Sequence, residues 1–392
     1  MTRERPFTIL ALASEFKAVP FLQECKRQGC HVIVLVTAEH KDEPWPHESI
    51  DEFFDMPDVR IQPDITHAVS FLMRDRHIDR IVALDDYDVE TAADLREHLR
   101  MPGMGHSDAR LFRDKLAMRV RARNKGLNVP AFTGIFNYDD LRAFMGSVPA
   151  PWVFKPRTLA GSEGIQKFYH AEELWRTLDV LGDQKSYYLL EQFIPGDVYH
   201  VDALTWAGEV IFSLVSKYGA PPMATLQGGR VFSTRTLPRD SEEAILLRAL
   251  NEQLVKGMGR TYGPTHTEFI RAEDGTFYFL ETAARVGGGN IERHIEAATG
   301  LAIWQETARM ELADLRGEDY ELPTDLREDY AGLIACPSRI EYMDTVDYTD
   351  PEVYYRPRSK KFVSLIVGSP SYERIEELLA EYAERFVRDF MG

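Results

Sequence analysis

Residues 267–281 read TEFIRAEDGTFYFLE, two apolar runs on either side of Asp274 and Gly275. Asp-Gly between apolar runs is a favoured signal for a two-residue hairpin loop. Counting outward from that loop places Glu268 directly opposite Glu281, where like charges destabilise a strand pair. A divalent cation between them reverses the sign of that interaction, and carboxylates suit Mg²⁺. The alternative is an exposed hairpin whose two glutamates point into water.

An arginine and three glycines follow the hairpin. Arg285 lies four residues past Glu281, and Gly287–Gly289 open a helix that begins near Asn290. The amides at a helix N-terminus, with an arginine beside them, form an anion site. Glycines also serve as plain turns, but next to the paired glutamates they favour a phosphate or acyl-phosphate site.

A lysine followed by a glycine-rich loop lies upstream. Lys155 ends the strand PWVFK, and the loop TLAGSEG at residues 158–164 contains Gly161, Ser162 and Gly164. Backbone N–H groups of such a loop can cover phosphates, with the lysine as a point charge. The loop lacks the Walker A pattern, so it holds a nucleotide in a different way. The alternative is a mobile surface loop with a solvated lysine.

The segment EQFIPGDVYHVD at residues 191–202 reads as a strand, a short hinge and a second strand. Backbone groups of Phe193 and Ile194 at the hinge lack a regular partner in this prediction and can bind an adenine edge. His200 and Asp202 lie on one face of the second strand by alternation. A lone histidine is more often structural than a ligand.

Up to about residue 105 the chain alternates buried strands, at 7–13, 31–36 and 79–84, with amphipathic helices. This alternation predicts a doubly wound parallel sheet, without the glycine pattern of a dinucleotide site. Next comes a predicted helix, capped by Ser107 and running through Lys125, with Phe112, Leu116 and Val120 on one face. Beyond residue 151 the strands lie close together in sequence, as in antiparallel sheet, and a late strand is predicted at 361–367.

The chain has 392 residues and a net charge of −17. That sign disfavours general binding to nucleic acids or anionic lipids. No apolar run approaches the roughly 18 residues of a membrane helix. Three cysteines form no disulfide framework or metal motif, so we expect a cytoplasmic protein.

Four stretches together resemble the ATP-grasp superfamily, the carboxylate–amine ligases and relatives such as biotin carboxylase. They are RDKLAM with Lys115, FKPRTLAGSEGI with Lys155, EQFIPGDVYHVD, and TEF…FLETAARVGGGN, in the family's order and spacing. The resemblance covers nearly the whole chain. It implies an N-terminal doubly wound parallel-sheet domain and then an ATP-grasp fold of two α+β subdomains. The expected division is 1–106, 107–195, 196–315 and a C-terminal extension at 316–392.

The resemblance also implies roles for single residues and a cofactor, ATP with Mg²⁺ or Mn²⁺. Lys115 and Lys155 match residues that contact ATP phosphates, and the glycine-rich loop covers them. The adenine hinge corresponds to Glu191 through Ile194, and His200 looks like a histidine near the ribose. Matching positions for the metal ligands are Glu268 and Glu281, and for the arginine that steadies an acyl-phosphate, Arg285.

One position departs from the family's Glu-x-Asn-x-Arg pattern. Ala283 replaces the asparagine, a further metal ligand, and alanine cannot coordinate a cation. In the predicted hairpin His266 lies opposite Ala283, on the face shared by the two glutamates. We hypothesise that His266, or a water it holds, supplies the missing contact.

The reaction implied is ATP-dependent amide formation through an acyl-phosphate, with small-molecule carboxylate and amine substrates and a possible homodimer. Arg230 and Arg235 can each hold a substrate carboxylate, or pair with the acidic protein's own surface. One alternative is a biotin carboxylase-like enzyme. The other is a nucleotide-binding protein without turnover, in which Ala283 marks decay.

Overall fold

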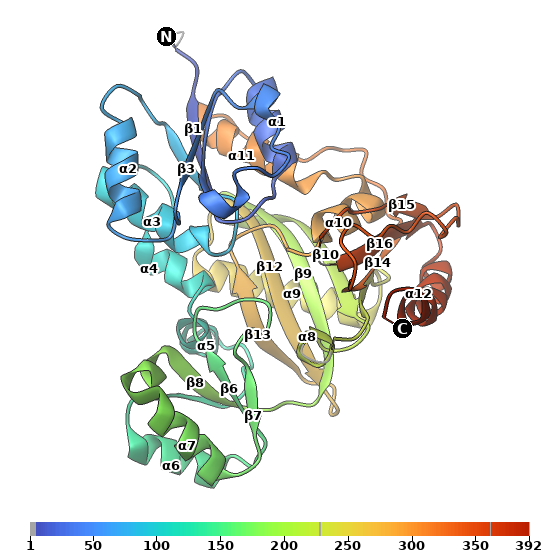
Figure 1. Ribbon diagram of the computed structural model, residues 1–392. Helices are drawn as coiled ribbons and strands as arrows, with labels where there is room; N and C mark the ends of the chain where they lie inside the picture. Colours follow the sequence, from blue (N-terminus) through green and yellow to red (C-terminus); the bar gives the residue numbers. More distant parts are fainter. Residues whose placement is uncertain (1–4, 227–228, 361, 392) are drawn as a thin grey trace.

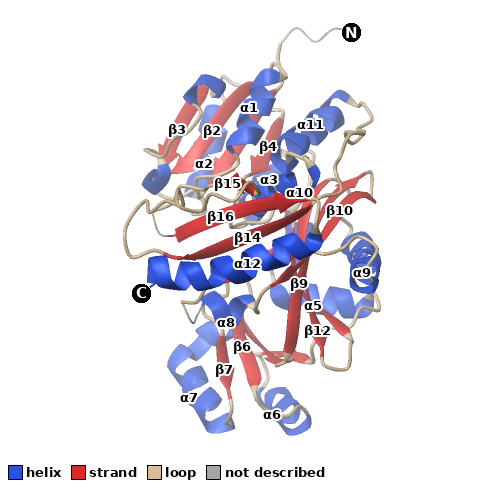
Figure 2. Cartoon of the chain, turned by 90° about the vertical axis from the view of Figure 1, so that its right-hand side faces the viewer, coloured by secondary structure: helices blue, strands red, loops and turns tan. Residues whose placement is uncertain are grey.

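The computed structural model describes residues 5–226, 229–360 and 362–391, arranged around three sheets (Figures 1 and 2). The N-terminal sheet is at the top of Figure 1, an eight-stranded sheet fills the centre, and a small sheet lies below it. No helix within these described ranges combines the length and apolar character needed to cross a bilayer.

The N-terminal sheet is parallel, in the order β3-β2-β1-β4, which confirms the doubly wound prediction. One face packs on α1 and the opposite face on α2 and α3, so β1 is buried on both sides. Strand β3 was not predicted, because EFFDM is a half-buried edge strand without a continuous apolar run. The elements are β1 (Thr8–Ala13), α1 (Val19–Arg27), β2 (His31–Thr37), β3 (Glu52–Met56), α2 (Asp64–Leu72), β4 (Arg80–Ala83) and α3 (Asp88–Leu99).

The small sheet is antiparallel, in the order β5-β8-β6-β7. Two helices cover one of its faces through a cluster that includes Phe144, Phe154 and Leu174. The elements are β5 (Phe132–Gly134), α6 (Tyr138–Ser147), β6 (Trp152–Pro156), β7 (Gln166–Phe168), α7 (Ala171–Leu181) and β8 (Tyr188–Gln192).

The large sheet is antiparallel, in the order β13-β12-β9-β10-β11-β14-β16-β15. Helix α12 lies along β14 and β16, as Figure 2 shows. Of the strand predicted at 361–367, residue 361 lies outside the described residues. The strands are β9 (Gly196–Trp206), β10 (Glu209–Tyr218), β11 (Phe232–Thr236), β12 (Gly263–Ala272), β13 (Phe277–Ala283), β14 (Tyr330–Pro337), β15 (Val353–Tyr355) and β16 (Phe362–Ser369). The helices of this half are α8 (Pro222–Leu226), α9 (Glu242–Met258), α10 (Ile291–Thr299), α11 (Ile303–Arg316) and α12 (Tyr372–Phe386).

The β12–β13 hairpin has the predicted pairing at its far end but not the predicted loop. Ala272 and Thr276 close a three-residue loop, in which Gly275 has a φ of +86°. Such a loop matches a type I turn followed by a left-handed residue, so the two-residue prediction is wrong. A bulge at Leu280 then shifts the register by one residue, so that Glu268 again pairs with Glu281.

The helix predicted from Ser107 through Lys125 is broken in two. It comprises α4 (His106–Ala109), a 3₁₀ turn at 110–112 and α5 (Lys115–Asn124). The Asp114 side chain caps α5 by accepting from the Leu116 and Ala117 amides at 3.0 and 3.3 Å. The break rotates the second half, so Val120 is exposed and the predicted apolar face is wrong.

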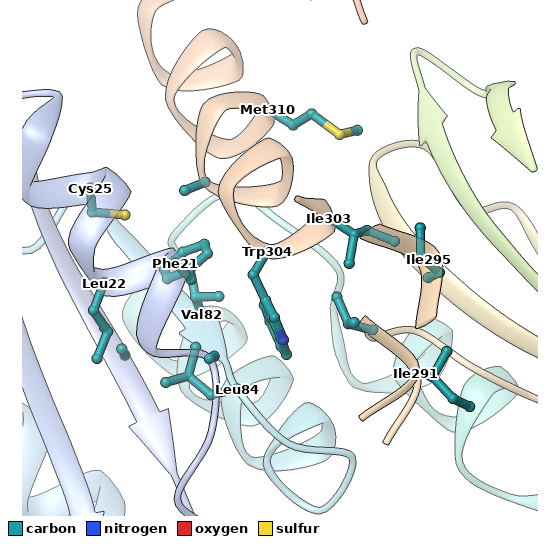
Figure 3. Close-up of a cluster of buried hydrophobic side chains, with 14 of the residues drawn as sticks. Phe21, Leu22, Cys25, Val82, Leu84, Ile291, Ile295, Ile303, Trp304 and Met310 are labelled. Carbon is teal, nitrogen blue, oxygen red and sulfur yellow. The ribbon is translucent and has the colours of Figure 1, made fainter. Parts of the chain in front are cut away.

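A shared core joins the N-terminal sheet to the rest of the chain. Phe21 of α1 and Trp304 of α11 pack edge to face, 6.5 Å between ring centroids, and Ile291 and Ile295 of α10 belong to the same cluster (Figure 3). This packing brings the carboxyl ends of the N-terminal strands near the beginning of α10.

Gly196, at the start of β9, lies where the backbones of two neighbouring strands of the large sheet approach closely. A Cβ there would lie 2.0 Å from the carbonyl oxygen of Arg271 on the neighbouring strand. Overpacking of this kind costs about 1–3 kcal/mol or more, so we expect Gly196→Ala to lower the melting temperature by several degrees. Gly146 in α6 has open space around it, and Gly146→Ala should be neutral or stabilising. Equal melting temperatures in the two variants would contradict the argument.

Candidate active site

A cavity of about 280 Å³ lies between the small sheet and the β12–β13 end of the large sheet. Charged side chains come to it from α5, from five strands of the two sheets and from the glycine-rich loop. They are Lys115, Lys155, Glu163, Lys167, Glu191, Glu268 and Glu281. Five of the seven are predicted site residues from motifs far apart in sequence; the other two, Glu163 and Lys167, were not predicted. The fold therefore gathers the predicted charges around one cavity.

The hinge after β8 forms an apolar end of the cavity. Phe193 and Ile194 line it together with Val153, Ile270 and Leu280. A slot of this composition suits a flat aromatic ring. The predicted free backbone group at Phe193 needs correction, because its N–H donates to the Pro151 carbonyl at 3.4 Å.

Lys155 and Arg119 share a single buried carboxylate. Lys155 Nζ pairs with Glu191 Oε1, and the Arg119 guanidinium lies 3.1 Å from Glu191 Oε2. Burial, together with the Arg119 charge, lowers the pKa of Lys155 to about 8. Burial opposes ionisation of Glu191, but Arg119 and Lys155 outweigh it and hold the pKa of that carboxyl below its usual range. Glu191 thus orients the lysine, and its carboxylate faces the two cations.

Lys115 connects the metal candidate Glu281 to the glycine-rich loop. Its Nζ lies 3.1 Å from Glu281 Oε2 and donates to the Leu159 carbonyl at 2.6 Å. Burial opposes ionisation of Glu281, but Lys115 and Lys155 outweigh it and lower the pKa of Glu281 to about 2. The carboxylate is therefore ionised, as a cation ligand must be.

Glu268 and Glu281 form the oxygen-rich part of the cavity. They are directly paired across β12 and β13, and the Tyr218 hydroxyl donates to Glu268 Oε1 at 2.8 Å. Four carboxylates (Glu163, Glu191, Glu268, Glu281) balance four cations (Lys115, Arg119, Lys155, Lys167), so an added divalent cation leaves a positive surplus for an anion. Carboxylate oxygens on facing strands are the donor type that Mg²⁺ or Mn²⁺ prefers. The residues present fit such a metal.

His200 does not line the cavity. It is fully buried, and its two ring nitrogens contact Asp202 at 2.7 Å and Thr234 at 2.8 Å. The fold therefore does not place His200 at the predicted ribose contact, because both of its ring nitrogens are hydrogen-bonded inside the large sheet.

His266 pairs with Ala283 as predicted, but its ring is held by acids. Nδ1 lies 2.8 Å from Asp202, and Nε2 lies 3.7 Å from Glu268 Oε1. Burial opposes protonation, but Asp202 and Glu268 raise the pKa of His266 to about 9. A protonated imidazole has no lone pair for a cation. In this state His266 can act at the metal site only through a water that it holds, and that contact stays a prediction.

The trio His200, Asp202 and His266 has donor atoms close enough to suggest a metal group. The separations of 2.7 and 2.8 Å between nitrogen and oxygen are those of hydrogen bonds, however. We interpret the trio as a buried hydrogen-bond chain that orients His266.

The glycine-rich loop has a backbone that other residue types adopt rarely. Gly161, Ser162 and Gly164 have φ values of +63°, +62° and +70°. Ser162 lines the cavity, whereas Gly161 and Gly164 are not among the residues around it. The loop is anchored at its start, where Thr158 accepts from Arg113 and Leu159 accepts from Lys115.

Arg285 lies outside this cavity, beside the beginning of α10. Its Nη1 donates to the Val286 carbonyl at 2.9 Å, and its Nε faces Asp86 Oδ1 of the N-terminal sheet at 3.5 Å. Gly287 packs so closely that a Cβ would lie 2.9 Å from Asp202 Oδ1. The residues of the predicted anion site thus lie where the segment after β4 meets the beginning of α10.

The two proposed substrate arginines differ in their contacts. Arg235 is held by α12, through Glu376 at 2.9 Å and the Tyr372 hydroxyl at 3.1 Å. Arg235 therefore follows the second of the two expectations, in which the arginine pairs with the protein's own acidic surface. Arg230 is exposed.

Sequence reasoning missed Arg119, Arg113, Asp86 and Tyr218. Arg119 follows Lys115 by four residues, a spacing that places both on one helix face and could have marked it. Asp86 follows β4, at the carboxyl end of a strand beside the topological switch point, where ligands gather in open α/β sheets. Arg113 and Tyr218 carried no comparable signal.

Comparison with known proteins agrees with the four motifs and with this cavity. Residues 148–293 match the model of the ATP-grasp domain. The chain is 26% identical over 333 residues to an L-arginine-specific L-amino acid ligase of Bacillus subtilis, covering 82% of this chain and 78% of the relative.

Two solved structures illustrate the fold. An L-amino acid ligase from Bacillus licheniformis superposes with a TM-score of 0.78 at 21% identity, covering 97% of this chain and 98% of that one. The biotin carboxylase domain of a Hydrogenobacter thermophilus 2-oxoglutarate carboxylase, solved with MgADP, has a TM-score of 0.69 at 17% identity, covering 95% and 88%. The resemblance seen in the four motifs is confirmed over residues 148–293, which match the ATP-grasp domain, and the chain as a whole is similar to L-amino acid ligases.

Proposed function

We propose that this protein is an ATP-dependent carboxylate–amine ligase that joins amino acids through an acyl-phosphate and releases ADP and phosphate. The observation that carries the proposal is the pair Glu268–Glu281, set opposite Lys115 and Lys155 in one cavity. A cavity with paired acids for a metal and buried lysines for phosphates suits phosphoryl transfer, which needs positioning and charge neutralisation more than a nucleophile.

Each side chain has a distinct task in this proposal. Glu268 and Glu281 would hold Mg²⁺ or Mn²⁺, which supplies charge neutralisation at the phosphates when bound. Lys155 and Lys115 bind phosphate oxygens, and Phe193 and Ile194 enclose the adenine. Beyond the cavity, Arg285 and the α10 amides steady the acyl-phosphate group.

The substrate class rests on the relatives. Proteins similar to this one are described as L-amino acid ligases. We therefore propose an amino acid as the carboxylate donor and a second amino acid as the amine. The buried, unpaired thiols of Cys25, Cys30 and Cys336 fit the reducing cytoplasm, which we propose as the location. The four-part division and a homodimer remain predictions.

The test is release of ADP from Mg²⁺ and ATP across a matrix of amino acids taken in pairs, with bicarbonate as an additional arm. We expect turnover that requires one particular pair and yields a dipeptide by mass spectrometry. Turnover with bicarbonate alone would favour the biotin carboxylase-like alternative. Tight ATP binding without ADP release in any arm would favour the non-catalytic alternative and reject the ligase.

The lowered pKa of Lys155, about 8, predicts how ATP affinity depends on pH. Bound phosphates favour the charged lysine, so above pH 8 binding takes up a proton and the dissociation constant rises by up to about tenfold per pH unit. Below pH 8 the lysine is already charged and the curve is flat. Isothermal titration calorimetry in buffers of different ionisation enthalpy measures the uptake. Lys155→Arg, which stays charged, should flatten the curve; an unchanged slope would assign the proton to another group.

A further inference from the structure

Asp86 stands between two arginines that come from different parts of the chain. It follows β4 of the N-terminal sheet and is 6% exposed. Its Oδ2 pairs with Arg113 Nη1, and its Oδ1 faces Arg285 Nε at 3.5 Å. Arg113 precedes α5, and Arg285 precedes α10. One carboxylate thus joins three segments that lie far apart in sequence.

Arg113 extends the contact to the glycine-rich loop. Its Nη2 donates to the Thr158 carbonyl at 2.5 Å, and its guanidinium lies 5.2 Å from the centroid of the Tyr87 ring. The side chain is almost fully buried. Because Thr158 is the first residue of the loop TLAGSEG, the position of the loop is tied to the N-terminal sheet through Arg113.

Arg285 faces Asp86 on one side and Gly288 on the other. A Cβ on Gly288 would lie 3.9 Å from Arg285 Nη1, so the guanidinium lies against the backbone that opens α10. At 3.5 Å the contact with Asp86 is an ion pair longer than a hydrogen bond. Among the described residues neither Asp86 Oδ1 nor Arg285 Nε has a hydrogen-bond partner. Two buried polar atoms that face each other unbonded would both be satisfied by a shift of a few tenths of an ångström.

Electrostatics make the carboxylate necessary for this arrangement. Arg113 is buried, Arg285 is half-buried, and both are permanently charged, with Asp86 within ion-pair distance of each. Without Asp86 the two guanidinium groups would repel each other, and Arg285 would lose the contact that fixes its Nε side.

We propose that Asp86 is a positioning residue: it holds Arg285 against the beginning of α10 and, through Arg113, couples that arginine to the backbone of the glycine-rich loop. This rests on the proposed function for the role of Arg285, but the coupling itself is a property of the fold. Binding of ATP in the cavity should therefore also slow amide exchange at the carboxyl end of β4.

The experiment is amide hydrogen exchange with and without MgATP, in wild-type protein and in Asp86→Asn. In the wild type, ATP should protect residues 158–164 and also residues 84–90. In Asp86→Asn the first protection should persist and the second should be lost. Protection of 84–90 that is the same in both proteins, or absent in the wild type while 158–164 is protected, would overturn the proposal. This readout does not require turnover, so it separates failure of the coupling from failure of the ligase assignment.

Kinetics supply the second readout. We expect Asp86→Asn to lower kcat 10- to 100-fold with the KM for ATP within about twofold, and Asp86→Glu to recover part of that loss. Adding Arg285→Lys to Asp86→Asn should cost less than Arg285→Lys costs the wild type, because both act on one contact. Additive losses would overturn the proposal.

Matched variants keep the result interpretable. Asp75 is an exposed acid that pairs with Arg76 in the N-terminal part of the chain, and Asp75→Asn should leave exchange at 84–90 and kcat unchanged. If Asp86→Asn does not fold because Arg113 keeps only the more distant Glu90, at 4.0 Å, as an ion-pair partner, Asp86→Asn with Arg113→Gln removes both charges. The double variant should show the same loss of protection at 84–90, and retained protection would count against the coupling.

Discussion

Replacing Glu281 by alanine is expected to lower ATP turnover at least about 100-fold. Glu281 contacts both kinds of charge in the cavity. It pairs with Lys115 at 3.1 Å and lies opposite Glu268 across the hairpin. Its removal takes away one of the two proposed metal ligands and releases Lys115 from its ion pair. The measurement is ADP release at saturating ATP over a series of Mg²⁺ concentrations, in which the residual activity should need more metal than the wild type.

The matched control for Glu281→Ala lies in the same hairpin. Glu273 is an exposed acid in the loop between β12 and β13, and Glu273→Ala should retain wild-type turnover. Melting curves of both variants show whether the hairpin is intact. A Glu281→Ala protein that folds, turns over ATP at the wild-type rate and has an unchanged metal requirement would reject the metal assignment.

The pairing of these two glutamates could be predicted from sequence, although the loop that produced the prediction was wrong. The Asp274-Gly275 signal correctly marks a hairpin, but the real loop has one residue more. The bulge at Leu280 compensates for it, so Glu268 and Glu281 end on the same rung. The residues that favour a turn are local and can be recognised in the sequence, whereas a bulge depends on how the strand packs.

Long-range contacts were the part that sequence could not supply. Motifs separated by up to 166 residues, Lys115 and Glu281, could be placed in one site only through the family resemblance. Asp86 and Arg285 belong to no shared motif, and it is the packing of the N-terminal sheet and α1 against α11 that brings their segments together. His200 shows the converse: alternation placed it correctly on the face of Asp202, but only the structure reveals that both its nitrogens are occupied.

Lys155→Ala is expected to weaken ATP binding by about 10- to 100-fold and to abolish most turnover. The lysine is 6% exposed and is one of the four cations that balance the four carboxylates around the cavity. Without it the cavity has an excess of negative charge, and Glu191 retains only Arg119 as its partner. The phosphates of ATP then lie near the Glu191 carboxylate without the Lys155 ammonium group between them. In a buried site this repulsion is poorly screened. Calorimetry gives the binding loss, and ADP release gives the turnover.

Two further variants separate charge from packing. Lys155→Met keeps a long side chain against β8 without its charge, so it should lose binding as Lys155→Ala does while preserving the melting temperature better. Lys256 forms surface pairs with Glu209 and Glu252, and Lys256→Ala should be neutral in both assays. If Lys155→Met binds ATP as tightly as the wild type, then the lysine acts by filling space and the phosphate contact must come from Lys115 alone. If both Lys155 variants lose binding to the same extent, the charge on β6 is what holds the nucleotide.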